Sequence, residues 1–344
     1  MAQTIQLRRG TAAQWAAANP TLAAGEMGLM TDIQAFKIGD GSTPWNSLSG
    51  PAQPSGVAYI DAGVTSETVD MPAPAGGQLR VYAKRIANRS MLRFIGPSGL
   101  DTAVQPILAR NKIGMFCPPG NATTATTMGT YTAPTATGTA TARNVSTANL
   151  FTRMRRLGYV SAATAGSLAG ARVAAAQMTV GGSVGTGFFK VTRFGVSDAA
   201  VVTAARMFVG VSASTAAPTN VEPATLVNCI GVGCGAADAN LRLFYGGSVA
   251  QTPIDLGADF PATTTNTNVY ELALFAPPDT ADVHWQVKRL NTGDVAAGTL
   301  ANSGGVALPS TTTLLTYLQA WRSNNATAAA VGLDIMSDYI ETDY

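Results

Sequence analysis

Few residues in this sequence could act as the general base that activates a catalytic nucleophile. The chain has one histidine, His284, and catalysis by a Ser–His or Cys–His pair needs a base beside the nucleophile. His284 lies in VHWQVKRL, where apolar Val283, Trp285 and Val287 alternate with polar residues as in a half-buried strand. We therefore expect it to be an ordinary outward-facing polar residue. A GxSxG motif is absent as well, and no nucleophilic catalytic site is predicted.

Paired carboxylates are the next chemistry to consider. In YIETDY, Glu341 and Asp343 would share one face of a strand. Glycoside hydrolysis uses two carboxyl groups roughly 5 to 9 Å apart, but the pair lies at the carboxyl terminus, where a fraying strand positions side chains poorly. We interpret the two acids as structural or solubilising charges and expect no catalytic residues.

Metal and phosphate sites are not indicated either. Cys117, Cys229 and Cys234 are odd in number and form no CxxC pair, which argues against a disulfide framework and a zinc site. The glycine clusters GGSVGTG and GVGCG lack the Lys-Ser/Thr of a phosphate loop. Asp238 and Asn240 offer two oxygen donors where calcium takes six to eight. No cofactor and no metal are predicted.

Surface recognition requires less: an exposed aromatic ring flanked by amide and guanidinium donors. The segment YLQAWRSNNATA, 317–328, is predicted to be a loop between strands that offers this combination. Alternatively, Trp321 closes the end of the core while RSNNAT stays an exposed polar loop. Second choices are Tyr245 and Trp285. The candidate receptor-contact residues are Trp321, Arg322, Asn324, Asn325 and Tyr245.

The elements that would position these residues are mainly β-strands. From about residue 151, eight apolar segments alternate with Gly-, Asn-, Asp-, Pro- and Thr-rich turns, a pattern typical of a β-sandwich of jelly-roll or concanavalin-like type. The strand order is similar to that of concanavalin-like lectin domains, with a carboxyl-terminal strand expected to pair with an early one. The Thr- and Ala-rich stretch 123–147 is expected to form extended surface strands. We assign 121–344 to this sandwich.

Charge excludes one class of partner and hydropathy another. Only 12% of the residues are charged and the net charge is +2, too balanced for a protein that neutralises many phosphates. The one basic cluster, RMRRLGY, is interpreted as a solvated turn and not as a phosphate site. No apolar run reaches the roughly 18 residues of a membrane span, and no leader peptide is recognised. Neither nucleic-acid binding nor membrane insertion is predicted.

The first fifty residues read as a separate module. We expect a short strand in TIQLRRGT, a helix capped by Thr11 and anchored by Trp15, and two further strands that end at the Asp40-Gly41 turn. A unit this small is marginal alone, which favours oligomerisation. SGPAQPSG, 49–56, reads as a linker, and 51–120 is assigned to this linker and a β-rich neck.

The motifs of this module carry a resemblance. RRGT, QW, NP, GE, FKIGDG, Trp45 and NSL occur in the order seen in the amino-terminal module of tailed-bacteriophage tail fibres and receptor-binding proteins, such as the major tropism determinant. The resemblance implies attachment to tail or baseplate proteins, a homotrimer, and a place in the tail fibre of the virion. The residues expected to pack between chains are Trp15, Phe36, Ile38 and Trp45.

Together these inferences predict a structural and adhesive protein. It would attach the virion to a bacterial surface receptor, whether pilus, lipopolysaccharide or capsule, by multivalent binding without catalysis. Two alternatives stay open: a tailspike-type polysaccharide depolymerase, and a passive fibre segment that binds no receptor.

Overall fold

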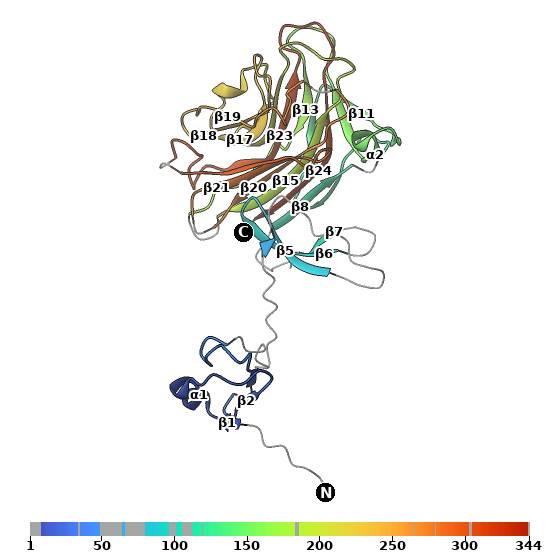
Figure 1. Cartoon of the computed structure of the whole chain (residues 1–344). Coiled ribbons are helices and arrows are strands. Elements are labelled where there is room, and N and C mark those ends of the chain that lie inside the picture. The colour runs from blue at the N-terminus through green and yellow to red at the C-terminus, as the bar shows by residue number, and fades with distance from the viewer. Residues whose placement is uncertain are drawn as a thin grey trace. The chain divides into compact units, whose positions relative to one another are not determined.

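The computed structural model describes residues 8–33, 35–48, 64–65, 80–95, 101–104, 112–118, 120–182, 186–263, 265–278, 280–302 and 305–342. The chain divides into two compact units, Met1–Ala62 and Gly63–Tyr344, which are drawn in Figure 1. Both are mainly β. The predicted linker, 49–56, lies outside the described residues. None of the helices in these ranges is long and apolar enough to span a bilayer.

The first unit is a three-stranded sheet with one helix. Strand β1 (Arg8–Gly10) runs parallel to β2 (Met27–Met30), and β3 (Ala35–Ile38) pairs antiparallel with β2. Helix α1 (Ala12–Ala18) begins where the side chain of Thr11 accepts a hydrogen bond from the Gln14 backbone N–H, and the backbone N–H of Thr11 donates to the side-chain Oε1 of Gln14. This reciprocal capping satisfies donors that a helix start leaves free, and it confirms the predicted helix.

Two tryptophans form the centre of this unit. The rings of Trp15 and Trp45 stack with their centroids 4.1 Å apart, and both residues are buried beside Leu22, Met30 and Ala35. Trp15 Nε1 donates to the carbonyl of Leu29. The two rings are therefore core groups of their own chain, and the prediction that they pack against a sister chain is wrong.

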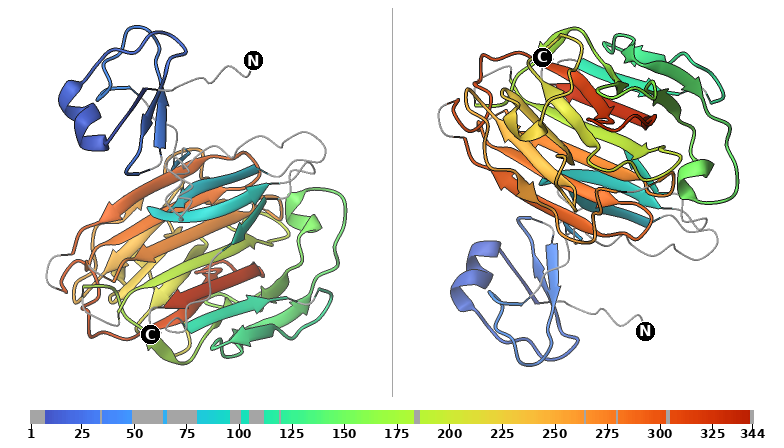
Figure 2. Two further views of the ribbon diagram at one scale, coloured as in Figure 1. Left: turned by 90° about the horizontal axis from the view of Figure 1, so that it is seen from below. Right: turned by 90° about the horizontal axis from the view of Figure 1, so that it is seen from above.

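The second unit is a two-layered β-sandwich, whose layers Figure 2 shows from two sides. One layer has the order β10-β13-β23-β16-β17-β18-β19, with β14 also paired to β23. Its strands are β10 (Thr135–Thr137), β13 (Leu168–Arg172), β14 (Ala176–Met178), β16 (Arg206–Ser212), β17 (Cys229–Cys234), β18 (Arg242–Gly246), β19 (Ile254–Asp255) and β23 (Leu315–Ser323).

The other layer has the order β11-β12-β24-β15-β20-β21-β22, with β8 joined to β24 and β9 to β8. Its strands are β8 (Lys112–Cys117), β9 (Thr126–Gly129), β11 (Thr139–Ala142), β12 (Leu157–Val160), β15 (Phe188–Val196), β20 (Tyr270–Ala276), β21 (Val283–Arg289), β22 (Val295–Leu300) and β24 (Gly332–Thr342). The pairing of the last strand, β24, with the early strands β8 and β12 confirms the expectation from the sequence.

A smaller sheet of the same unit has the order β4-β5-β6-β7. Its strands are β4 (Val64–Thr65), β5 (Arg80–Ile86), β6 (Arg89–Ile95) and β7 (Asp101–Val104). The β5–β6 hairpin docks on the nine-stranded layer: Ala87 N donates to Gln286 Oε1, and both Nη atoms of Arg89 donate to the carboxylate of Glu341. Two short helices, α2 (Leu150–Arg153) and the 3-10 turn η1 (Pro223–Thr225), complete the unit.

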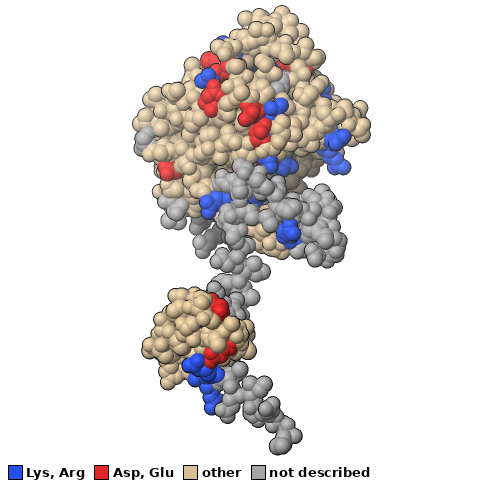
Figure 3. Space-filling model, viewed as in Figure 1, with Lys and Arg blue, Asp and Glu red and all other residues tan. Residues whose placement is uncertain are grey.

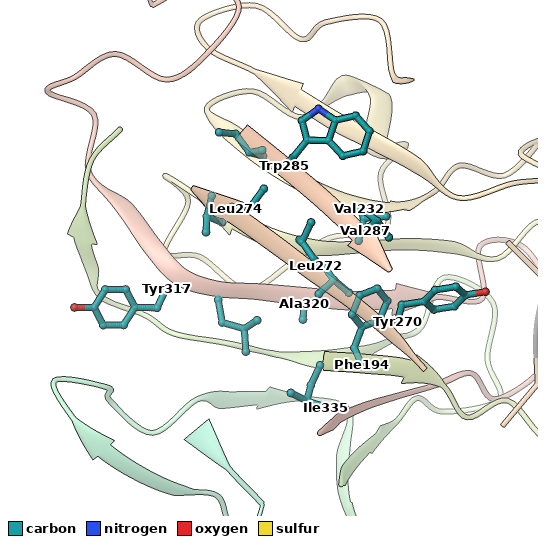
Figure 4. Close-up of a cluster of buried hydrophobic side chains, with 14 of the residues drawn as sticks. Phe194, Val232, Tyr270, Leu272, Leu274, Trp285, Val287, Tyr317, Ala320 and Ile335 are labelled. Carbon is teal, nitrogen blue, oxygen red and sulfur yellow. The ribbon is translucent and has the colours of Figure 1, made fainter. Parts of the chain in front are cut away.

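The main core lies between the two layers. Figure 4 shows Leu272, Leu274, Trp285 and Val287 of the nine-stranded layer directed toward side chains of the other layer, such as Val232. The inward direction of Trp285 and Val287 is the one that their alternation with polar residues predicts. Gln286 is buried all the same, because the β5–β6 hairpin covers that outer position.

Strand β23 is the element that the sequence interpretation misplaced. It lies between β13 and β16, and every residue from Leu315 to Ser323 is buried. A strand buried on both faces shows no polar–apolar alternation, which is why YLQAWRS resembled a loop. The prediction that Trp321 and Arg322 occupy a loop is therefore wrong, and the chain turns only after Ser323.

Candidate functional site

A small pocket lies on the face of the eight-stranded layer that is turned away from the main core. Phe208 of β16 and Trp321 of β23 are cross-strand partners there, and they form a second apolar cluster with Cys229 and Phe244. The connection from β16 to β17, which contains η1, supplies the other wall. The pocket measures about 90 Å³ and is lined by Phe208, Ser212, Ser214, Ala217, Pro218, Thr219, Val221, Leu226, Gln319 and Trp321.

The chemistry of this pocket is polar but uncharged. Ser212, Ser214 and Thr219 contribute hydroxyl groups, and no lining residue is ionisable. Gln319 Oε1 is buried and has no hydrogen-bond partner among the described residues. A buried acceptor without a donor is costly, so a ligand hydroxyl or N–H placed there would gain a hydrogen bond. The pocket is smaller than the roughly 300–1,000 Å³ of sites that enclose a drug-sized ligand, and it suits the edge of a neutral polar group.

Of the predicted contact residues, only Trp321 reaches this pocket. Its side chain is 2% exposed, so it forms the floor and offers little ring surface for stacking. Arg322, the next residue, forms an ion pair with Asp198 that is buried on both sides. Asp198 Oδ1 also accepts from Gly332 N. Arg322 therefore joins β23 to the start of β24 and is not available to a ligand.

The other predicted contact residues are separate from one another. Asn324 is buried, and its Nδ2 donates to the carbonyls of Thr164 and Ala329, so it holds the turn after β23. Asn325 is half-buried with a positive φ of 53°, a conformation that Asn tolerates better than most residues. Tyr245 packs against the main core. The predicted set is thus not a single site.

The groups considered for catalysis are engaged in structural contacts. His284 Nδ1 lies 2.8 Å from Thr299 Oγ1, and its Nε2 lies 3.3 Å from Asn88 Nδ2. The carboxylate of Glu341 is held by Arg89, whose guanidinium also lies over the ring of Phe189. Asp343 lies outside the described residues.

The groups considered for metal binding have other roles as well. Asp238 pairs with Arg242 and accepts from Gly235 N. Burial raises the pKa of Cys229 to about 12 and that of Cys234 to about 11, so both thiols stay protonated near neutral pH. Within the described ranges, no three His, Cys, Asp or Glu side chains gather as metal ligands would. Charged side chains are few and scattered over the face shown in Figure 3.

The sequence interpretation missed Phe208, Gln319 and Ser214 as pocket residues. Phe208 lies in a segment that read as an ordinary core strand, and Gln319 lies in the segment predicted to be a loop, where Trp321, Arg322, Asn324 and Asn325 were chosen instead. One signal was present: 213–228, between β16 and β17, is a long segment rich in Ala, Thr and Pro. Such a connection is long enough to fold over a sheet face, so Ser214 and Thr219 were the residues within reach of sequence reasoning.

Comparison with known proteins gives similarities of two kinds. Among solved structures, peanut lectin shares 10% identity over 68% of this chain and 98% of its own, with a TM-score of 0.44. Lectin II from Ulex europaeus shares 13% over 61% and 93%, with a TM-score of 0.41. Arcelin-5, a lectin-like defence protein from Phaseolus vulgaris, shares 10% over 68% and 99%, with a TM-score of 0.42. No curated protein matches the chain.

The match by sequence lies in the first unit. Residues 5–43 match the family model of the major tropism determinant N-terminal domain. This range includes the whole of β1, α1, β2 and β3, the elements built around the stacked Trp15 and Trp45 pair. The first unit of this chain is therefore similar to the amino-terminal domain of a phage tropism determinant.

Proposed function

We propose that this protein is a receptor-binding protein of a tailed bacteriophage, which attaches the virion to the host surface without catalysis. The observation that carries the proposal is the match of residues 5–43 to the major tropism determinant N-terminal domain. In this proposal the first unit binds tail or baseplate proteins of the virion, and the sandwich contacts the host. The receptor classes considered are pilus, lipopolysaccharide and capsule.

An exposed apolar face of the first unit supports association into a homotrimer. Ala35 and Lys37 of β3 face the tryptophan core, where Lys37 Nζ lies 5.2 Å from the centre of the Trp45 ring. Phe36 and Ile38 alternate with them and remain 38% and 49% exposed. Their strand partners are Leu29 and Met27. We call these four residues, Met27, Leu29, Phe36 and Ile38, the apolar sheet face, and we assign sister copies of the chain as its occupant.

The uncharged pocket supports recognition of a neutral hydroxylated group, such as a sugar of the host surface. Gln319 Oε1 would accept a hydrogen bond from a ligand hydroxyl, and the exposed residues Ser214 and Thr219 line the solvent-facing side of the pocket. A pocket this shallow binds weakly by itself. Three copies on one trimer compensate, because the second and third contacts form at a high effective concentration.

The contacts of Glu341 support binding without hydrolysis. The carboxylate of Glu341 receives two hydrogen bonds from Arg89 and one from the hydroxyl of Tyr339. A carboxylate whose oxygens already accept three hydrogen bonds is poorly placed to donate a proton to a leaving group.

Competition of phage adsorption tests the proposal. The purified chain should block adsorption to host cells, and Ala217→Trp should weaken this block at least tenfold by filling the pocket. Ala237→Trp is the matched control, since Ala237 is also exposed but lies in the turn after β17. No block by the wild-type chain at saturating concentration would favour a passive fibre segment. New reducing ends after incubation with host polysaccharide would instead identify a depolymerase.

A further inference from the structure

An amine and a carboxylate meet inside the main core of the sandwich. Lys190 of β15 and Asp338 of β24 are both fully buried, and Lys190 Nζ contacts Asp338 Oδ1. The strands are antiparallel neighbours in which Thr192 is the partner of Asp338, so Lys190 lies one diagonal step away on the same face. The two side chains are therefore held together by the sheet itself and do not need a loop to position them.

The surroundings favour the uncharged form of the amine. An ammonium has three N–H donors, yet among the described residues Asp338 is the one group to which Lys190 Nζ donates. Burying an ion with unsatisfied donors is expensive in a low-dielectric core. Burial accordingly lowers the pKa of Lys190, although Asp338 opposes the shift. Moving one proton from the ammonium to the carboxylate gives a neutral amine beside a carboxylic acid.

Two hydroxyl groups are directed at the same carboxyl group. Thr192 Oγ1 donates to Asp338 Oδ1 at 2.5 Å, and Tyr131 Oη donates to Oδ2 at 2.6 Å. Burial raises the pKa of Tyr131 far above its ordinary value, so the phenol is protonated and has a proton to place on Oδ2. Donors on both oxygens polarise the carboxyl carbon, and Tyr131 in particular can hand a proton to an oxygen that leaves.

From this arrangement we infer that Lys190 and Asp338 condense into an amide that cross-links β15 to β24. The neutral Nζ attacks Cγ of the protonated Asp338, and a C–N bond forms. The carboxyl proton and a proton from Tyr131 convert Oδ2 into water as the C–Oδ2 bond breaks, and the proton lost from Nζ returns to Tyr131. One water molecule leaves. Nothing is oxidised or reduced, so no co-reactant is needed.

The cross-link would secure the carboxyl-terminal strand. β24 pairs with β8, β12 and β15 and carries both Asp338 and Glu341. An amide between Lys190 and Asp338 closes a long loop of the chain, and such closure restricts the unfolded state in the way a disulfide does. Cys117, Cys229 and Cys234 are free thiols and form no disulfide with one another. The amide would therefore give the sandwich a covalent cross-link that these cysteines do not provide.

The chain contains a matched control in a second buried ion pair. Arg322 and Asp198 are also buried and in direct contact, but a guanidinium stays protonated and is a poor nucleophile. The same conditions should therefore leave Arg322 and Asp198 unlinked. A branched peptide joining their segments would indicate nonspecific condensation during preparation.

Mass spectrometry of the unfolded wild-type chain tests the inference. We expect a mass lower than that of the sequence, with or without Met1, by one water molecule. Tryptic digestion should give a branched peptide joining Lys190 to Asp338, without cleavage after Lys190. Lys190→Met should restore the full mass, Asp338→Asn should lose ammonia instead of water, and Tyr131→Phe should leave most chains unlinked.

If a variant fails to fold, the mass and the tryptic digest of the wild-type chain are enough to test the inference. A wild-type chain of full mass, cleaved by trypsin after Lys190, would overturn the inference and leave a noncovalent ion pair. A Tyr131→Phe chain that cross-links as completely and as fast as wild type would overturn the role of Tyr131 alone.

Discussion

The two units of this chain differ in how far each can bury its own apolar side chains. Among the described residues of the first unit, the buried apolar cluster consists of Trp15, Leu22, Met30, Ala35 and Trp45, and Phe36 and Ile38 stay exposed on its apolar sheet face. The sandwich encloses a continuous core between two layers and can bury charged groups such as Lys190 and Asp338 within it. Because stability grows with buried apolar area, the first unit should depend on association and the sandwich should not.

The largest effect is expected from changing the apolar sheet face. Phe36→Ser with Ile38→Ser should convert the proposed trimer to a monomer of 35.2 kDa at micromolar concentration, because both exposed apolar side chains of β3 are lost from the apolar sheet face. Light scattering measures the change. The matched control is Val201→Ser with Val249→Ser, two exposed valines of the sandwich. A wild-type chain that is already monomeric would contradict the dependence on association.

The same substitution in both units should have unequal consequences. Trp15→Ala and Trp321→Ala each remove a buried indole at a cost of about 3–5 kcal/mol. That loss should abolish the first unit, whose core is small, and should only lower the unfolding temperature of the sandwich. Calorimetry of the full chain can follow the two units separately. Equal loss of both transitions in either variant would show that the units do not fold independently.

The two units also differ in how well their structure could be predicted from the sequence. In the first unit, local signals determined the structure: Thr11 caps the helix, Asp40-Gly41 forms the turn, and the short strands lie where expected. In the sandwich, alternating strands such as β21 were recognised, but β23 was not, because burial on both faces removes the alternation. The pocket depends on the pairing of β16 with β23, in which Phe208 is opposite Trp321 and Gly210 is opposite Gln319. These partners are more than a hundred positions apart, and no local pattern reveals the pairing.

A smaller loss of stability is expected from breaking the buried ion pair between Arg322 of β23 and Asp198, which also contacts the start of β24. Asp198→Ala leaves Arg322 buried without its partner, and removing one member of a buried pair costs about 3 kcal/mol or more. Asp198→Ala combined with Arg322→Met should recover much of this loss, because the unpaired charge is gone as well. Chemical denaturation measures both. A double variant no more stable than the single one would indicate that Asp198 acts through its bond to Gly332 N instead.

The smallest effect concerns the turn that ends β3, and it depends on pH. The hydroxyl of Thr43 and the backbone N–H groups of Thr43 and Ser42 donate to Asp40 and hold its pKa well below the ordinary value of 3.8. A depressed folded-state pKa means that the carboxylate stabilises the fold at every pH above about 3.8 and loses this contribution as the pH falls further. The first unit of the wild type should therefore lose stability below pH 4. Its stability should then approach that of the Asp40→Asn variant. Because Asp40 is exposed, the difference should be small at neutral pH, and calorimetry of the full chain between pH 7 and 3 would measure it. A difference between the two chains that persisted unchanged to pH 2 would show that the turn depends on the shape of the side chain and not on its charge.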